Sequence, residues 1–218
     1  MKLPSLLLEE DNAPARDVLS YYYGLSGHRH GAFTGAWFDT WDTTGSRSVD
    51  SDRFTADDLV AVSCLSVHVP PEAARVLLSD GADRFSALLS QLGPDRDLVE
   101  ERHPWPEDWA GWVLWSELAA LPGMGPTTVS KVFARKRPRL RPICDSVVAR
   151  VIDSTQLWEP LRAQLQAIPD LHPRLLGLRD ELKLPVDVSA LRVFDVLTWM
   201  EGKGYSSCPW SSAQQGRH

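Results

Sequence analysis

The sequence predicts an all-α fold, and three observations support that prediction. Apolar residues recur at helical spacing in most segments after residue 55, and proline and glycine separate these segments into ordinary helix lengths. No convincing alternating strand occurs outside residues 24–52. With 218 residues, 43% of them hydrophobic, the chain can bury the core of one or two compact domains.

Charge and cysteine content exclude several classes of protein. The formal net charge is -6 and the pI is about 5.5, which argues against a nonspecific polycation that coats nucleic acid but leaves a local basic patch possible. Three scattered cysteines (Cys64, Cys144 and Cys208) form no CxxC pair, so we expect a reducing cytosol and no disulfide framework. Neither an iron–sulfur cluster nor a zinc site is expected, and we predict no metal and no cofactor.

The N-terminus lacks the long apolar core that is typical of a signal peptide. The first 17 residues are apolar only briefly and then acidic, and no run is long enough to span a bilayer. We therefore expect a cytoplasmic protein that does not bind membranes, and no protein partner is predicted. Residues 206–218 form a polar tail.

The first predicted region covers residues 1–54, which we expect to pack on the core. Residues 13–23 have helix composition and precede Gly24. In residues 24–52, glycines recur among aromatic side chains, which favours an ordered loop. His28 and His30 lie in this loop, and without further ligands we interpret them as solvated side chains rather than metal ligands.

The second predicted region, residues 55–155, holds most of the helices. Thr55 and Asp58 resemble a capping box at the start of a buried helix. Two further short helices follow Pro70–Pro71 and end at Gly93, and the charged, proline-rich segment 94–108 is the predicted domain joint. In the rest of this region, helices are expected at about 109–120, 126–136 and 145–153. The third region, 156–205, completes the fold with helices expected at about 155–168, 173–183 and 189–201. The tryptophans of segment 109–120 are interpreted as core.

The hairpin between segments 109–120 and 126–136 is a candidate phosphate-binding device. Its sequence is LPGMG, Leu121 to Gly125. Two glycines permit a turn that exposes backbone N–H groups, and the next helix adds its own unpaired N–H groups and positive dipole end. The candidate DNA-binding residues here are Leu121, Gly123, Met124, Gly125, Thr127 and Thr128. The alternative is an ordinary glycine corner between two helices.

A basic run follows the hairpin. Residues 131–141 hold six basic residues and no acid within an acidic chain. Such runs are usually solvated surface. Next to a candidate phosphate site, we predict instead that Lys131, Arg135, Lys136 and Arg137 contact a polyanion backbone.

LPGMGPTT, followed after a characteristic spacing by ICDSVVARVI, resembles the helix-hairpin-helix DNA glycosylases of the endonuclease III and MutY type. The resemblance maps Asp145 onto the family's catalytic aspartate and Arg150 onto a later arginine of the motif. A weaker match places His68 where the family has a residue that wedges into the duplex. Motif support covers about residues 55–155. The chain also resembles an uncharacterised bacterial branch that shares this hairpin and basic run.

This resemblance implies two helical subdomains that flank a cleft, with the helix-hairpin-helix at residues 109–136 and the Asp145 helix at 145–153. It also implies a monofunctional DNA glycosylase for base excision repair, which binds double-stranded DNA and releases a damaged or modified base. Thr127 stands where bifunctional members carry a lysine, so no Schiff base and no strand cleavage are expected. The family's usual histidine after the aspartate and its cysteine cluster are absent as well.

Two other functions remain open at this point. A non-catalytic helix-hairpin-helix DNA-binding protein is the main alternative, in which Asp145 only caps its helix. A helical domain that binds a protein is the third.

Overall fold

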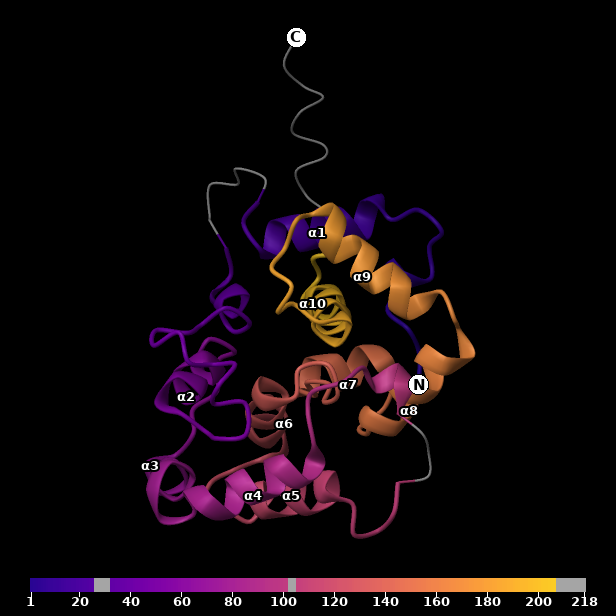
Figure 1. The fold of residues 1–218 in the computed structure, drawn as a ribbon. Helices are drawn as coiled ribbons and strands as arrows, with labels where there is room; N and C mark the ends of the chain where they lie inside the picture. Colours follow the sequence, from indigo (N-terminus) through magenta and orange to yellow (C-terminus); the bar gives the residue numbers. More distant parts are fainter. Residues whose placement is uncertain (26–31, 102–104, 207–218) are drawn as a thin grey trace. The chain divides into compact units, whose positions relative to one another are not determined.

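The computed structural model describes residues 1–25, 32–101 and 105–206, and within these ranges every regular element is helical (Figure 1). This confirms the all-α prediction. No helix in the same ranges is long and apolar enough to cross a bilayer. His28, His30 and Cys208 fall outside the described residues.

The chain forms two compact units, and their boundaries differ from the predicted ones. Unit 1 combines Met1–Phe33 with Cys144–His218, and unit 2 is Thr34–Ile143. The boundaries therefore fall after residues 33 and 143, not after 54 and 155. Segment 94–108, predicted as the domain joint, lies inside unit 2.

Unit 2 contains residues 109–136, the segment for which a helix-hairpin-helix was predicted. Its elements are η2 (Thr34–Trp37), α2 (Ala56–Ser63), α3 (Pro71–Arg75), the π-helical segment η3 (Val76–Asp80), α4 (Ala82–Leu92), η4 (Leu98–Glu100), α5 (Ala110–Ala119) and α6 (Pro126–Lys136). The helices α4 and α5 pack together, as do α2 and α6. Phe38, Phe85 and Phe133 are among the large side chains that are fully or almost fully buried in this unit.

The start of α2 forms as expected, but its end does not. Thr55 and Asp58 make a complete capping box. The helix then ends at Ser63, and Ser66 adopts a left-handed conformation with φ 59°. An irregular segment, residues 64–69, therefore replaces the longer helix that the composition suggested, and it leads to Pro70 and α3.

The tryptophans of α5 lie at the edge of the core rather than inside it. Gly111, Leu114 and Leu118 form the buried face of the helix. Trp109 and Trp112 are half-buried, and Trp109 stacks on Trp105 with ring centroids 4.5 Å apart. The interpretation of these tryptophans as core is therefore only partly right.

Unit 1 is built around α10 (Ala190–Gly202), whose residues are buried along most of its length. The helices α7 (Ser146–Ile152), α9 (Leu171–Glu181) and α1 (Ala13–Tyr22) pack against it, and η1 (Ser5–Leu7) and α8 (Trp158–Ala167) complete the unit (Figure 1). At Gly202, an added Cβ would lie 2.5 Å from Cγ1 of Val147, so α10 and α7 approach closely there.

Candidate nucleic-acid interface

The hairpin joins α5 to α6 in the conformation that its glycines suggest. Gly123 has φ 71°, in the left-handed region that favours glycine. The N–H of Met124 donates to the carbonyl oxygen of Leu121 at 3.1 Å, and the Met124 side chain is buried. Pro122, Gly123 and Gly125 are exposed around this anchor. The turn is thus fixed from inside and presents its backbone outside.

The N-terminus of α6 can accept an anion. No side chain caps it, because its N-cap residue is Gly125. The first helical hydrogen bond runs from the N–H of Val129 to the carbonyl of Gly125, so the N–H groups of Thr127 and Thr128 precede the ladder. A Cβ built at Gly125 would meet nothing within 4 Å, which leaves room for a ligand in front of it. The Thr127 side chain is half-buried and that of Thr128 is buried.

The structure brings the loop of His68 next to the hairpin. His68 is exposed in the chain between α2 and α3. Two residues later, the ring of Pro70 lies against Gly123, where Cγ would be 2.8 Å from an added Cβ. The sequence placed these segments more than fifty residues apart, and only the resemblance linked them.

The four residues of the basic run that were predicted to contact DNA are buried, which contradicts that prediction. Lys131, Arg135, Lys136 and Arg137 are at most 5% exposed and have partners inside unit 2. Asp58 receives a hydrogen bond at Oδ1 from Nε of Arg135 at 3.0 Å and one at Oδ2 from Nζ of Lys136 at 2.7 Å. Arg135 and Lys136 therefore connect α6 to α2 inside the unit.

The same run holds the irregular segment that precedes α2. Arg135 donates from Nη1 to the carbonyl of Phe38 at 2.6 Å and from Nη2 to the carbonyl of Trp41. Arg137 donates to the carbonyls of Ser51 and Gly93 at 2.9 and 2.8 Å. Buried backbone carbonyls need such donors, and a loop has no regular ladder to supply them.

Burial also changes the proton affinity of these cations. Desolvation lowers the pKa of Arg135 and of Lys136, and the charge and hydrogen bonds of Asp58 act in the opposite direction on both. Lys131 completes the set by donating from Nζ to the carbonyl of Leu65 at 2.9 Å, next to the end of α2. The four cations are therefore structural.

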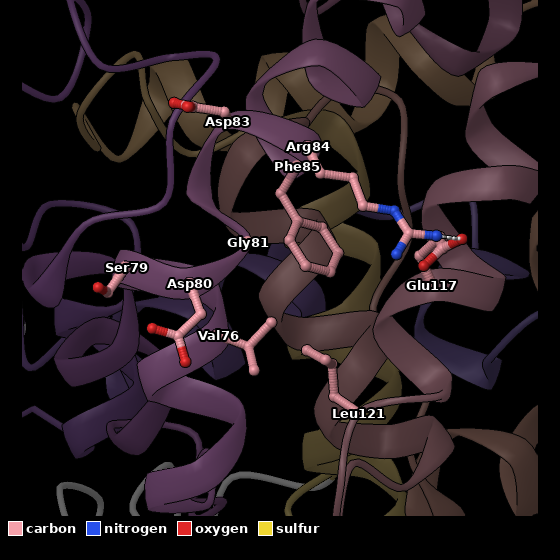
Figure 2. A pocket seen from close by; sticks show the side chains of 9 residues that line it. All are labelled: Val76, Ser79, Asp80, Gly81, Asp83, Arg84, Phe85, Glu117 and Leu121. Carbon is pink, nitrogen blue, oxygen red and sulfur yellow. Dashed lines mark hydrogen bonds and ion pairs between the residues drawn. The ribbon is translucent and has the colours of Figure 1, made fainter.

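An acidic pocket of about 440 Å³ reaches the hairpin at Leu121 (Figure 2). Asp80, Asp83 and Glu117 line it together with one arginine, Arg84, which pairs with Glu117. Asp80 comes from the π-helical segment, and Arg75 pairs with it at 2.9 Å. The sequence did not predict this pocket. With two of its three carboxylates already paired to arginines, the described lining of the pocket offers a phosphate no unpaired cation, and the turn and the start of α6 are the candidate anion site.

Asp145 lies in unit 1 and caps α7. Its Oδ1 accepts the N–H groups of Val147 and Val148 at 2.9 and 3.0 Å, and the side chain is half-buried. The structural alternative for this residue, a helix cap, is therefore present. These two hydrogen bonds explain the position of Oδ1 by helix capping alone, without a catalytic role for the carboxylate.

A groove of about 740 Å³ runs along α7 from the residue after Asp145. Ser146 and Arg150 line it from the helix, and Asp153, Ser154 and Thr155 line it beyond the helix end. Arg150 is exposed. The groove thus carries one cation, Arg150, about one and a half turns from Asp145, and one carboxylate, Asp153.

Comparison with known proteins gives a family and no activity. Neither a curated protein nor a solved structure matches the chain significantly. Among the described residues, no three His, Cys, Asp or Glu side chains are grouped so that they could hold a metal ion. The model of a family of unknown function, DUF6308, matches residues 15–202. The chain therefore belongs to the DUF6308 family.

Proposed function

We propose that this protein binds the sugar–phosphate backbone of double-stranded DNA through the hairpin 121–125 and the start of α6. The observation that carries the proposal is the exposed, uncapped helix start that follows a glycine turn. Backbone N–H groups and the helix dipole favour a phosphate there. The contact reads the backbone and not the bases.

The burial of the basic run sets the expected strength of binding. Few cations remain near the hairpin to displace counterions, and the neighbouring pocket is acidic. Affinity should therefore be modest, with a shallow dependence on salt, since the slope is roughly 0.9 per phosphate that a cation neutralises.

Gly125→Asp tests the phosphate site directly. Gly125 has φ −76° and ψ 164°, which aspartate adopts without strain at an N-cap. The new carboxylate would accept the N–H groups that a phosphate needs and would repel the phosphate as well. We expect loss of binding to a fluorescent duplex in anisotropy titrations at low salt, with the thermal stability unchanged or raised.

Two controls accompany this variant. Gly125→Ala adds neither a cap nor a charge and should bind like the parent. Val49→Asp adds the same charge elsewhere in unit 2, at a position that is 84% exposed, and should weaken binding little. Parent-like binding by Gly125→Asp would exclude the hairpin as the phosphate site. If the parent itself does not bind at low salt, the hairpin is only a helix corner.

A second candidate function is base excision, and the groove that begins at Ser146, the residue after Asp145, favours it. In this proposal the base is flipped out of the duplex and the bond from its nitrogen to C1′ breaks, with the electron pair leaving on the base. The Asp145 carboxylate stabilises the positive sugar or accepts a proton from the attacking water. The products are a free base and an abasic site.

Asp145→Asn separates this chemistry from the helix cap, since asparagine caps helices about as well as aspartate. We expect the variant to keep its stability and DNA binding and to lose base release on a panel of damaged and modified duplexes. If the parent releases no base from any of them, the protein is a binder only. If the variant matches an active parent, Asp145 is not catalytic.

A further inference from the structure

Unit 2 carries an aromatic pocket that has no part in the proposed DNA contact. Trp37, Thr40, Trp41, Asp42 and Thr43 line an open hollow of about 380 Å³ in the segment after η2. All five residues come from one stretch of chain, so a tight local fold makes the pocket.

The surrounding contacts hold this fold in place. The N–H of Trp41 donates to the carbonyl of Trp37 at 2.9 Å, which closes the turn under the pocket. From the interior, Arg135 binds the carbonyls of Phe38 and Trp41. On the far side, Thr43 donates from its backbone N–H and its hydroxyl to Asp57, at 2.7 and 2.8 Å. The walls are therefore formed before any ligand arrives.

Two tryptophans line the hollow. Trp37 is 50% exposed, which is unusual for a tryptophan outside an interface. Trp41 also lines the pocket, and its indole nitrogen is buried, so any part of the ring that reaches the hollow is carbon. Such surfaces attract cations through the negative face of the ring.

Asp42 adds a negative charge at the rim. It is exposed, and its carboxylate receives only long hydrogen bonds, from the hydroxyl of Thr44 at 3.5 Å and the N–H of Arg47 at 3.4 Å. Among the described residues no ion pair to Asp42 is found. Hydrogen bonds from Thr43 keep the pKa of the neighbouring Asp57 below its usual value, so a second carboxylate stays charged nearby.

We propose that this pocket binds an organic cation, a quaternary or alkylated ammonium group, against the aromatic lining of Trp37 and Trp41 with Asp42 as its counter-charge. A nucleobase would also stack on Trp37, but its phosphates would meet Asp42 and Asp57. A sugar would need several hydrogen-bond donors and acceptors, and apart from two threonine hydroxyls the walls offer ring carbon and one carboxylate. The proposal is independent of the hairpin.

Titration of the full-length protein with choline tests the proposal, followed by the indole N–H signals in two-dimensional NMR. The indole N–H signal of Trp37 is assigned by its absence from the spectrum of Trp37→Phe. On addition of choline, this signal and that of Trp41 should shift together. The neutral isostere 3,3-dimethylbutan-1-ol has the same shape without the charge and should bind at least fivefold more weakly. Trimethyllysine in a short peptide distinguishes a protein side chain from a free small molecule as the source of the cation.

Three variants check the roles of the residues. Trp37→Leu keeps an apolar wall without the π face and should weaken choline binding about five- to thirtyfold, and Trp37→Phe should weaken it less. Asp42→Asn should weaken it severalfold, while Asp83→Asn, which removes the same charge elsewhere in unit 2, should have no effect. Equal binding of choline and its isostere, or preferential binding of a neutral sugar such as glucose, would overturn the proposal.

Discussion

Asp58 illustrates how one residue can determine the charge pattern of a surface far along the chain. Its carboxylate completes the capping box of α2 and also receives Arg135 and Lys136 of α6. All three charged side chains are at most 3% exposed. Two cations and one anion in the interior are stable only together, since each alone would be desolvated without a counter-charge.

Asp58→Asn should therefore destabilise the protein severely. It leaves two buried cations without their carboxylate, a change that costs about 3–5 kcal/mol. Urea unfolding followed by circular dichroism measures the effect, with Asp57→Asn as the control because Asp57 bonds only to the Thr43 segment and lies outside the cluster. A loss below about 1 kcal/mol for Asp58→Asn would show that the cluster contributes little.

Asp95 should make the stability depend on pH. Burial raises the pKa of its carboxyl from the ordinary value to about 6, although hydrogen bonding by the N–H of Arg139 and the charges of Arg139 and Arg137 act in the opposite direction. The folded protein therefore binds a proton more tightly than the unfolded chain. The stabilisation that results is present below about pH 4 and is lost as the pH rises to about 6.

This loss amounts to about 3 kcal/mol at most, since each pKa unit corresponds to about 1.4 kcal/mol. Urea titrations between pH 4 and 7 measure it as the difference between the parent and Asp95→Asn. Asparagine keeps the acceptor for the N–H of Arg139 and does not titrate, so the variant should lack this part of the pH dependence. Parallel profiles for the two proteins would contradict the assignment.

Residue-level reasoning from sequence succeeded where partners are close in the chain and failed where they are not. The Thr55–Asp58 capping box and the Asp145 cap each span three residues, and both formed. The basic run has no acid nearby, and its counter-charge lies 77 positions before Arg135. No local pattern distinguishes such buried arginines from solvated ones, so the sequence could not show that the run faces inward.

At the scale of elements, close helix contacts depend on single glycines. Gly202 ends α10 where it meets α7, and a Cβ there would lie 2.5 Å from Val147 and 2.9 Å from Val151. Gly177 lies inside α9, and a Cβ there would meet nothing within 4 Å. Both glycines are in unit 1, so they form a matched pair.

Alanine at these two positions should have opposite effects on stability. Gly202→Ala forces α10 away from α7 and should cost about 1–3 kcal/mol, as overpacking does. Gly177→Ala should raise stability by about 0.5–1 kcal/mol, because alanine favours the helix more than glycine. Thermal melts of the two variants and the parent measure both changes in stability. If Gly202→Ala raised the melting temperature, α10 and α7 could move apart at little cost in free energy.

The helices that the sequence placed well have clear ends. Pro126 at the first position of α6 and the Ser189 cap of α10 each fixed a start within a residue. The π-helical segment after α3 and the left-handed Ser66 were not predicted, because neither has a composition that distinguishes it from ordinary helix or turn. The acidic pocket beside the hairpin depends on that segment and was missed with it.

At the scale of the whole molecule, unit 2 is continuous in sequence and has its own core and its own ion-pair cluster. A fragment of residues 34–143 should therefore fold alone, with helical circular dichroism and a cooperative melt, and should keep the hairpin's DNA binding. Its Gly125→Asp version is the matched control for binding. A fragment that remains unfolded would show that unit 2 needs unit 1.

The discontinuity of unit 1 has a consequence for synthesis on the ribosome. Its first piece ends at Phe33, and its central helix, α10, emerges only after Gly202. At about 5–20 residues per second, α1 waits on the order of ten seconds or more with its apolar face uncovered while the contiguous unit is made. Nascent chains should thus expose the N-terminal segment to chaperones until the last helix is released.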